Sequence, residues 1–129
     1  MAKAITDPRT VLARAMKEEG PGGLREAVEL LAHQLGYETR HIRDSRRQNV
    51  SDLPDLFLVR GRLLVRGMLG RAMWIDLKRE GKYPTPGQFS MMSRMGEAGL
   101  EVYLFRPSDL FSGRILAILR GIEETTNAQ

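Results

Sequence analysis

Two short segments of the chain carry side chains that can hold a metal ion and activate water. The first is Asp76-Leu77-Lys78, which follows the apolar residues 73–75 and is predicted to end a β-strand. Because successive strand side chains point to opposite faces, Asp76 and Lys78 project from one face and Leu77 points into the core. A carboxylate binds a hard divalent cation through oxygen, and a lysine can orient or deprotonate a water molecule. An isolated Asp-x-Lys is nevertheless common by chance, so the prediction needs a second acidic residue.

Asp55 supplies that residue at the start of another apolar strand, Pro54-Asp55 followed by residues 56–59. A proline is tolerated there because the first residue of a strand need not donate a hydrogen bond to the sheet. The spacing between Asp55 and Asp76 suits two strands of one β-meander, so their carboxylates can meet at one point. Two carboxylates can hold Mg²⁺ while water and a phosphate oxygen complete its octahedron. Taken alone, Asp55 fits a turn residue at a strand start equally well.

The segments before the first acidic residue are predicted to be helical. Asp7-Pro8 has the pattern of an N-cap and first helical residue, and this helix is expected to run to about Glu19 and stop at Gly20-Pro21. A second helix is expected over residues 23–35. Its buried stripe has three-to-four spacing and comprises Leu24, Val28, Leu31 and Leu35.

The remaining chain is predicted to alternate between strands and helices. Expected strands are 37–43, 55–60, 62–66, 72–78 and 101–105, and expected helices start at Thr85-Pro86-Gly87-Gln88 and at Leu110, the last running to Glu123. Phe89, Met92 and Met95 are expected to form the buried face of the helix after Thr85. The predicted fold is α/β, a mixed central β-sheet flanked by helices in the order α-α-β-β-β-β-α-β-α. One domain is expected over 1–129, with 1–22 as an N-terminal helical extension and 124–129 as a frayed tail.

Composition favours a polyanionic partner. The chain has 20 Lys and Arg against 16 Asp and Glu, a formal net charge of +4, and a pI of about 9.8. Arginines crowd two segments, which a solvated surface would also explain: Arg40, Arg43, Arg46 and Arg47, then Arg60, Arg62, Arg66 and Arg71. The absence of cysteine excludes disulfides, thiol catalysis and cysteine-based zinc sites. With no apolar run long enough for a membrane span and no signal-peptide pattern, a cytoplasmic protein without membrane partners is expected.

The whole constellation resembles the PD-(D/E)XK nuclease superfamily and, more narrowly, is similar to the VRR-NUC domain, a virus-type replication-repair nuclease module. The resemblance runs from about Leu24 to Leu110. Its pieces, in chain order, are Leu35-Gly36-Tyr37, His41, Asp44-Ser45-Arg46-Arg47, Pro54-Asp55-Leu56, Asp76-Leu77-Lys78, Thr85-Pro86-Gly87-Gln88, Ala98-Gly99 and Arg106-Pro107-Ser108-Asp109. Each piece is weak, but their order and spacing together are specific. The resemblance implies a restriction-endonuclease-like core.

The resemblance also implies roles for individual residues. Asp55, Asp76 and the backbone carbonyl of Leu77 would bind Mg²⁺ or Mn²⁺, and Lys78 would position the attacking water. Gln88 matches a glutamine that faces the active site in relatives, but it also occupies the third helical position of a capping box, and both roles stay open. The expected DNA contacts are His41, Arg43, Ser45, Arg46, Arg47, Arg79 and Lys82, of which His41 is equally explained by packing.

Two departures from the family pattern concern metal binding. Relatives commonly carry Glu where this chain has Asp76, which the superfamily permits. Relatives also carry a further metal-binding glutamate that aligns with Gly23, which cannot bind metal. Glu26, one helical turn later, can substitute, although a solvated helix charge is the favoured interpretation. Asp52 can add a carboxylate but fits a turn residue better.

The function implied is Mg²⁺- or Mn²⁺-dependent endonuclease cleavage of DNA, with metal-activated water attacking in line. Stand-alone relatives resemble Holliday-junction resolvases of DNA recombination and repair, in a bacterial or phage-infected cell. Paired incisions by single-site chains imply a homodimer of C2 symmetry. Two alternatives stay open: a non-catalytic DNA-binding module on the same fold, and a flap or nicking nuclease. RNA cleavage is disfavoured because the sequence shows no base-stacking platform.

Overall fold

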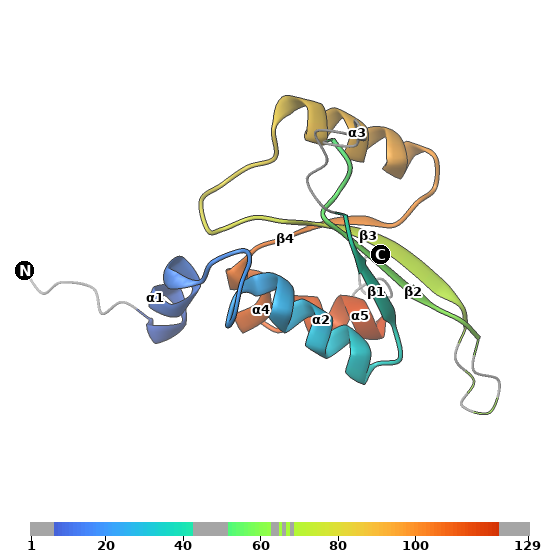
Figure 1. Cartoon of the computed structure of the whole chain (residues 1–129), viewed down its shortest axis with the longest axis horizontal. Coiled ribbons are helices and arrows are strands. Elements are labelled where there is room, and N and C mark those ends of the chain that lie inside the picture. The colour runs from blue at the N-terminus through green and yellow to red at the C-terminus, as the bar shows by residue number, and fades with distance from the viewer. Residues whose placement is uncertain (1–6, 43–51, 63–64, 66, 68, 122–129) are drawn as a thin grey trace, which may run out of the picture.

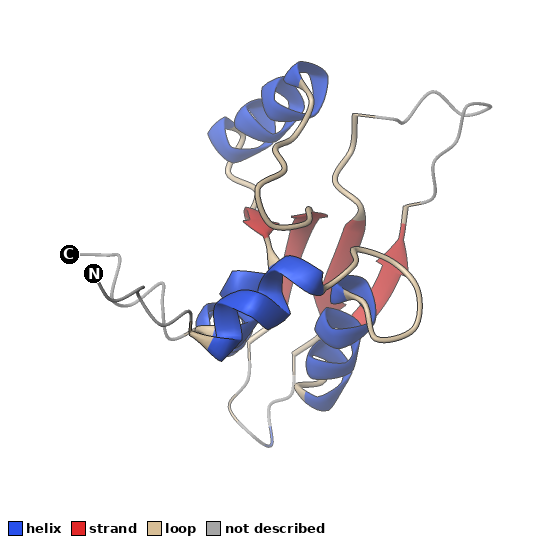
Figure 2. Cartoon of the chain, turned by 90° about the vertical axis from the view of Figure 1, so that its left-hand side faces the viewer, coloured by secondary structure: helices blue, strands red, loops and turns tan. Residues whose placement is uncertain are grey.

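The computed structural model describes residues 7–42, 52–62, 65, 67 and 69–121. A four-stranded sheet lies between two helical layers (Figure 1). Helices α2 (Leu24–Gln34), α4 (Pro107–Phe111) and α5 (Arg114–Arg120) lie on one face, and α3 (Pro86–Glu97) lies on the other (Figure 2). Helix α1 (Pro8–Ala15) packs beside α4. The predicted α/β class, with a mixed sheet flanked by helices, is confirmed.

The sheet has the strand order β1-β2-β3-β4. Its strands are β1 (Glu38–His41), β2 (Leu56–Arg60), β3 (Arg71–Leu77) and β4 (Val102–Phe105). The β1–β2 and β2–β3 pairs are antiparallel, whereas β3 and β4 are parallel and joined through α3. The chain segment after β3 therefore leaves the sheet at the end where Asp76 and Lys78 lie.

The strand expected over residues 62–66 is not observed where the structure describes it. Arg62 and Val65 belong to no strand, and the other three residues lie outside the described part. Arg60 pairs directly with Arg71, so residues 61–70 connect β2 to β3. Glycines in this connection weaken a strand because they bring no side chain to pack and lose more backbone entropy on folding. Three strands, not four, therefore precede α3 among the described residues.

The predicted final helix is two helices. The Arg106-Pro107-Ser108-Asp109 segment begins α4, which starts before the expected helix at Leu110. Pro107 is its first residue, and the Asp109 carboxylate accepts the Arg106 N–H at 2.8 Å. Gly113 then adopts φ +88°, which ends the first helical segment before α5 begins. A residue in this left-handed conformation cannot continue a right-handed helix.

The first helix also ends earlier than predicted, at Ala15 rather than Glu19. The carbonyls of Lys17 and Glu18 accept the N–H groups of Leu24 and Arg25 at 2.8 and 2.9 Å. The segment after α1 thus satisfies free donors at the start of α2, where Gly23 provides no side-chain cap. These hydrogen bonds compete with continuation of α1.

The main core lies between the sheet and helices α2 and α5, on the face of the sheet that these helices cover. The predicted stripe of α2 is confirmed: Leu24 and Val28 are buried, and Leu31 and Leu35 pack against the same cluster. The sheet and α5 contribute Leu56, Leu58, Met73, Ile75, Leu77, Phe105, Ile115, Ile118 and Leu119. On α3 only Met95 is buried, and Phe89, expected to be buried, is 65% exposed. Helix α3 packs against β4, at one edge of the sheet.

Candidate active site

Asp55 and Asp76 come together at one end of the β2–β3 pair. Leu56 pairs with Ile75 in this ladder, so Asp55 and Asp76 are the next two residues to face each other across the strands. Their side chains share the face that points away from the main core, because Leu56, Ile75 and Leu77 occupy the core face. The predicted meeting of the two carboxylates on neighbouring strands agrees with this register.

Backbone hydrogen bonds fix Asp55 in place. Its Oδ2 accepts the N–H of Leu77 at 2.9 Å, and its carbonyl accepts the N–H of Ile42 at 2.7 Å. Pro54 has no N–H to continue the ladder, and the Asp55 carboxylate supplies an acceptor to β3 where regular pairing ends. The arrangement holds the carboxylate beside the Asp76-Leu77-Lys78 segment.

Asp76 is the only charged or polar residue that is fully buried within the described part of the chain. Neither of its carboxylate oxygens has a hydrogen-bond partner there. Within the described residues, the ammonium of Lys78 forms an ion pair with this carboxylate: its Nζ lies 3.6 Å from Oδ2, and the Lys78 side chain is 15% exposed. A buried carboxylate without hydrogen bonds is costly, so such groups are rare and commonly serve a function. These carboxylate oxygens are suitable ligands for a hard cation.

The electrostatics of the pair reflect this burial. Loss of hydration, together with the negative charge of Asp55, raises the pKa of Asp76 to about 7, while Lys78 acts in the opposite direction. A bound cation would favour the ionised form. A perturbed carboxyl beside a second carboxylate and a lysine is a frequent property of catalytic sites.

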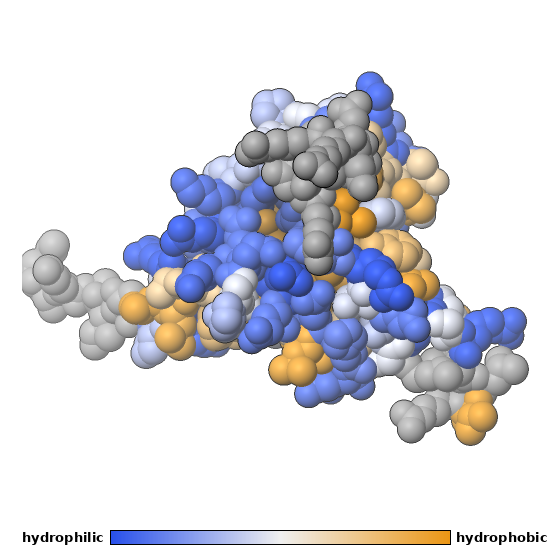
Figure 3. Space-filling model, in the orientation of Figure 1, coloured by the Kyte–Doolittle hydropathy of each residue, from blue (hydrophilic) through white to orange (hydrophobic). Residues whose placement is uncertain are grey.

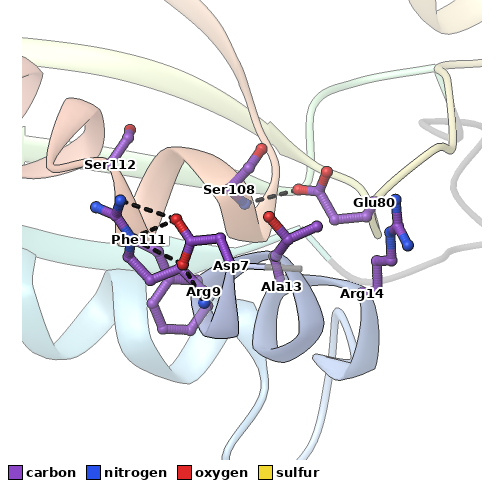
Figure 4. Close-up of a pocket in the computed structure, with 9 residues that line it drawn as sticks. Asp7, Arg9, Ala13, Arg14, Glu80, Ser108, Phe111 and Ser112 are labelled. Atoms are coloured by element: carbon purple, nitrogen blue, oxygen red, sulfur yellow. Dashed lines mark hydrogen bonds and ion pairs between the residues drawn. The ribbon is translucent and has the colours of Figure 1, made fainter. Parts of the chain in front are cut away.

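The segment after Lys78 is anchored on both sides. The N–H of Arg79 donates to Glu18 Oε2 at 3.1 Å, and the Arg106 guanidinium donates twice to the carbonyl of Lys82, at 2.8 and 3.0 Å. The Glu80 carboxylate accepts the N–H of Ser108 at 2.6 Å (Figure 4). The side chains of Arg79 and Lys82 are exposed and can reach a bound polyanion.

Gln88 forms the predicted capping box. Its Oε1 accepts the N–H of Thr85 at 3.0 Å, and its own N–H donates to Thr85 Oγ1 at 3.1 Å. The adjacent Gly87 lies against Asp52, because a Cβ at Gly87 would come within 2.6 Å of Asp52 Oδ1. The start of α3 therefore touches the turn that leads into Asp55, and in this arrangement the Gln88 amide caps the helix.

The position at which the expected family pattern has a metal-binding glutamate has no room for a side chain in this chain. Gly23 is buried, and a Cβ there would lie 2.8 Å from the carbonyl oxygen of Glu19. Glu26 is exposed, and its Oε1 accepts the N–H of Gly22 at 3.1 Å. Among the described residues, no group of three or more His, Cys, Asp or Glu side chains gathers where it could hold a metal. The site presents two carboxylates, which Mg²⁺ tolerates because it usually keeps several water ligands.

The expected DNA contacts divide into two sets. His41 lies at the end of β1, with Nε2 3.6 Å from Glu19 Oε1. Arg43, Ser45, Arg46 and Arg47 lie outside the described residues. The described chain before them ends at Ile42, which is hydrogen-bonded to Asp55. Ile42, the last described residue before them, therefore lies beside Asp55.

Two hollows lie away from this centre. One, of about 320 Å³, lies between α1 and α4; in it Asp7 and Arg9 form an ion pair of 3.0 Å (Figure 4). The other, of about 520 Å³, lies where β2 ends and β3 begins and is lined by Arg60, Arg71, Glu101 and Arg120 among others. Neither is lined by Asp55, Asp76 or Lys78.

One feature of this sheet face escaped the sequence interpretation. Phe57 and Trp74 face each other across β2 and β3, with ring centroids 4.8 Å apart and planes inclined by 48°. From the sequence alone, residues 73–75 are described only as apolar and no base-stacking platform is found. Trp74 is two residues from Asp76, and Phe57 is two residues from Asp55. Because side chains two apart on a strand share a face, this spacing could have predicted that the rings lie on the same face of the sheet as the carboxylates.

Comparisons with protein-family models, with curated proteins and with solved structures return no match to this chain. No helix in the described part is long and apolar enough to cross a membrane. The functional argument therefore depends on the site itself.

Proposed function

We propose that the chain is a metal-dependent, structure-selective DNA endonuclease with the restriction-endonuclease-like core of the VRR-NUC domain. One observation carries the proposal: the fully buried Asp76, whose two oxygens have no hydrogen-bond partner in the described structure, lies next to Asp55 and Lys78. Without a bound cation, this buried carboxylate has only the Lys78 ammonium, 3.6 Å away among the described residues, to offset a desolvation cost on the order of several kcal/mol. A cation between the carboxylates offsets that cost.

Each residue of the proposed site has its own role. Asp55, Asp76 and the carbonyl of Leu77 would hold Mg²⁺ or Mn²⁺. When bound, such an ion lowers the pKa of water and neutralises charge on the phosphate. Lys78, close to Asp76 but partly exposed, orients the attacking water at the phosphorus. Hydrolysis breaks one P–O bond of the phosphodiester and leaves a phosphate monoester and a free hydroxyl.

Basic side chains around this centre would hold the DNA backbone. Arg79 and Lys82 are exposed on the segment after Lys78, and His41 lies at the end of β1. Arg43, Ser45, Arg46 and Arg47 follow in sequence, and the net charge of +4 favours DNA over neutral partners. Such contacts give affinity and position without base specificity.

Holliday-junction resolution is the proposed biological setting, and a homodimer follows from it. One chain offers one pair of carboxylates, whereas resolution of a junction requires two incisions. A C2 dimer places two identical sites across a symmetric junction.

A non-catalytic DNA-binding module is the second candidate, favoured by one observation. Glu26 does not join Asp55 and Asp76 in a group of three. A flap or nicking nuclease would use the same residues on another DNA shape.

Calorimetry with Mn²⁺ separates the nuclease from the binding module. We expect one site per chain in the wild type and loss of detectable binding in Asp76→Asn, which keeps the side-chain volume but removes the charge. Glu26→Gln, which alters the exposed glutamate, should bind Mn²⁺ like the wild type. Intact junction binding without any Mn²⁺ site in the wild type would establish the binding module instead.

A further inference from the structure

The carboxylate face of the sheet carries a pair of aromatic rings one step away from the candidate active site. In the β2–β3 register Phe57 pairs with Trp74, two residues along each strand from Asp55 and Asp76. Side chains two apart on a strand share a face, so the rings and the carboxylates lie on the same side of the sheet. Two strand residues span about 6.6 Å, close to the rise of two nucleotides in one strand of B-form DNA.

These rings do not belong to the main core. The buried cluster of the described residues contains the alternate residues of both strands, Leu56, Leu58, Met73 and Ile75, but neither ring. Phe57 and Trp74 each remain partly exposed. They pack on each other in a tilted arrangement with centroids 4.8 Å apart, which fixes the orientation of each ring.

Helix α3, the helix on this face of the sheet, packs to one side of the rings. Helix α3 packs against β4, at the far edge of the sheet from β1 (Figure 2). Figure 3 shows apolar surface between α3 and the strands, next to a strongly hydrophilic surface. An apolar, aromatic surface that continues into a site for phosphate is suited to a nucleotide, whose base is apolar on its face and whose backbone is anionic.

We propose that Phe57 and Trp74 form a stacking surface for an unpaired nucleobase next to the phosphate that is cut. This inference rests on the proposed nuclease function and names its substrate class: DNA that offers an unpaired nucleotide within about two positions of the cut. In a duplex both faces of each base are already stacked, so the rings select flapped or single-stranded DNA, or a junction whose bases are unpaired at the branch point. Stacking on aromatic side chains is tolerant of sequence, because every base has a π-face.

The chain offers a direct probe, because Trp74 is its single tryptophan. Lys78→Ala, which keeps Trp74, would be titrated without divalent metal with a thymidine 12-mer, a flap substrate and a blunt duplex. Tryptophan fluorescence reports stacking, and the anisotropy of labelled DNA reports binding in the same samples. We expect quenching of Trp74 by the 12-mer and the flap, and little quenching by the duplex at equal saturation.

Two substitutions at Trp74 complete the test. Trp74→Leu keeps an apolar side chain without a π-face and should weaken binding of the 12-mer roughly five- to 150-fold, as expected for loss of one stacked base. Trp74→Phe keeps a ring and should recover most of that affinity. Circular dichroism of both variants verifies that they fold, and duplex binding should stay within twofold of the wild type.

The possible failures are distinguishable. If the wild type cuts DNA but Trp74 fluorescence does not change on binding and Trp74→Leu binds the 12-mer normally, the stacking surface is wrong and the nuclease stands. Equal quenching by duplex and single strand would also overturn the inference. If no DNA of any form binds, the proposed function falls, and the stacking surface falls with it.

Discussion

Among the described side chains, the carboxyl group of Asp76 lies in the least favourable environment for a charge. It is fully buried, has no hydrogen-bond partner there, and lies close enough to Asp55 for the second negative charge to matter. Lys78 compensates only in part, at 3.6 Å. A group of this kind weakens a fold unless a ligand binds it. Its energetic cost is therefore a measurable signature of the site.

The pH dependence of stability tests that cost in metal-free protein. With an unfolded pKa of 3.8 and a folded pKa of about 7, Asp76 binds more protons in the folded state, so the free energy of unfolding falls as pH rises from about 4 to 7. Asp76→Asn removes this loss, and at pH 8 it should be more stable than the wild type by on the order of 2 kcal/mol.

Urea unfolding in EDTA between pH 4 and 8 makes this measurement. Glu38→Gln alters an exposed carboxylate of β1 and serves as the control for removal of a surface carboxylate. A constant difference between Asp76→Asn and the wild type across this range would show that Asp76 is not strained.

For helices and strands, features that depend on local residue spacing could be predicted from the sequence. Features that depend on hydrogen bonds between separate segments could not. The α2 stripe and the Thr85–Gln88 capping box follow from residue spacing, and both are observed. The early end of α1 depends on hydrogen bonds from Leu24 and Arg25 to carbonyls that no local pattern reveals. The alternation of strand side chains correctly predicted that Asp55 and Asp76 lie on one face of the sheet. Because residues 73–75 were described only as apolar, the position of Trp74 on that same face was missed.

Gly23 should be intolerant of any side chain. A Cβ would lie 2.8 Å from the Glu19 carbonyl oxygen and 3.0 Å from that of Gly20, so backbone must move. We expect Gly23→Ala to lower the free energy of unfolding by about 1–3 kcal/mol. Gly61→Ala, with nothing within 4 Å of the added Cβ, should stay within about 0.5 kcal/mol of the wild type in the same urea titration.

Gln88 can be tested for its two roles separately. Gln88→Ala removes the side-chain half of the capping box and should cost about 1 kcal/mol, whereas Gln88→Glu retains an acceptor for the Thr85 N–H. If the cap is its only role, Gln88→Glu keeps full cleavage activity and near wild-type stability. A large loss of activity in a stable Gln88→Glu protein would instead assign the amide to the reaction.

For the whole molecule, the sheet is tied to the helical layer at the end opposite the carboxylates. Arg71 at the start of β3 forms a 2.7 Å ion pair with Glu101 and donates to the Ile118 and Leu119 carbonyls of α5 and to the Tyr37 hydroxyl. Tyr37 in turn donates to the Leu119 carbonyl at 2.8 Å. The Arg71 network and the candidate active site therefore lie at different ends of the same strand.

Arg71→Met should separate stability from activity. It leaves Glu101 without this partner and removes donors from the end of α5, so we expect a loss of about 2–4 kcal/mol in thermal or urea unfolding. Specific activity of the folded protein at low temperature should remain within twofold of the wild type. Arg9→Met, which breaks an exposed ion pair with Asp7, should leave the stability close to that of the wild type. Equal effects of both substitutions would contradict this division.

Cleavage of a labelled four-way junction with Mg²⁺ or Mn²⁺ tests the central claim most directly. Wild type, Lys78→Ala and Lys82→Ala would be compared at equal DNA saturation, with flap, nicked, duplex and single-stranded DNA alongside. We predict metal-dependent, symmetric cuts by the wild type, a loss of at least about 100-fold in Lys78→Ala with binding retained, and near-normal cleavage by Lys82→Ala once its weaker binding is saturated. A wild type that binds these substrates but cuts none of them with either metal would contradict the nuclease assignment.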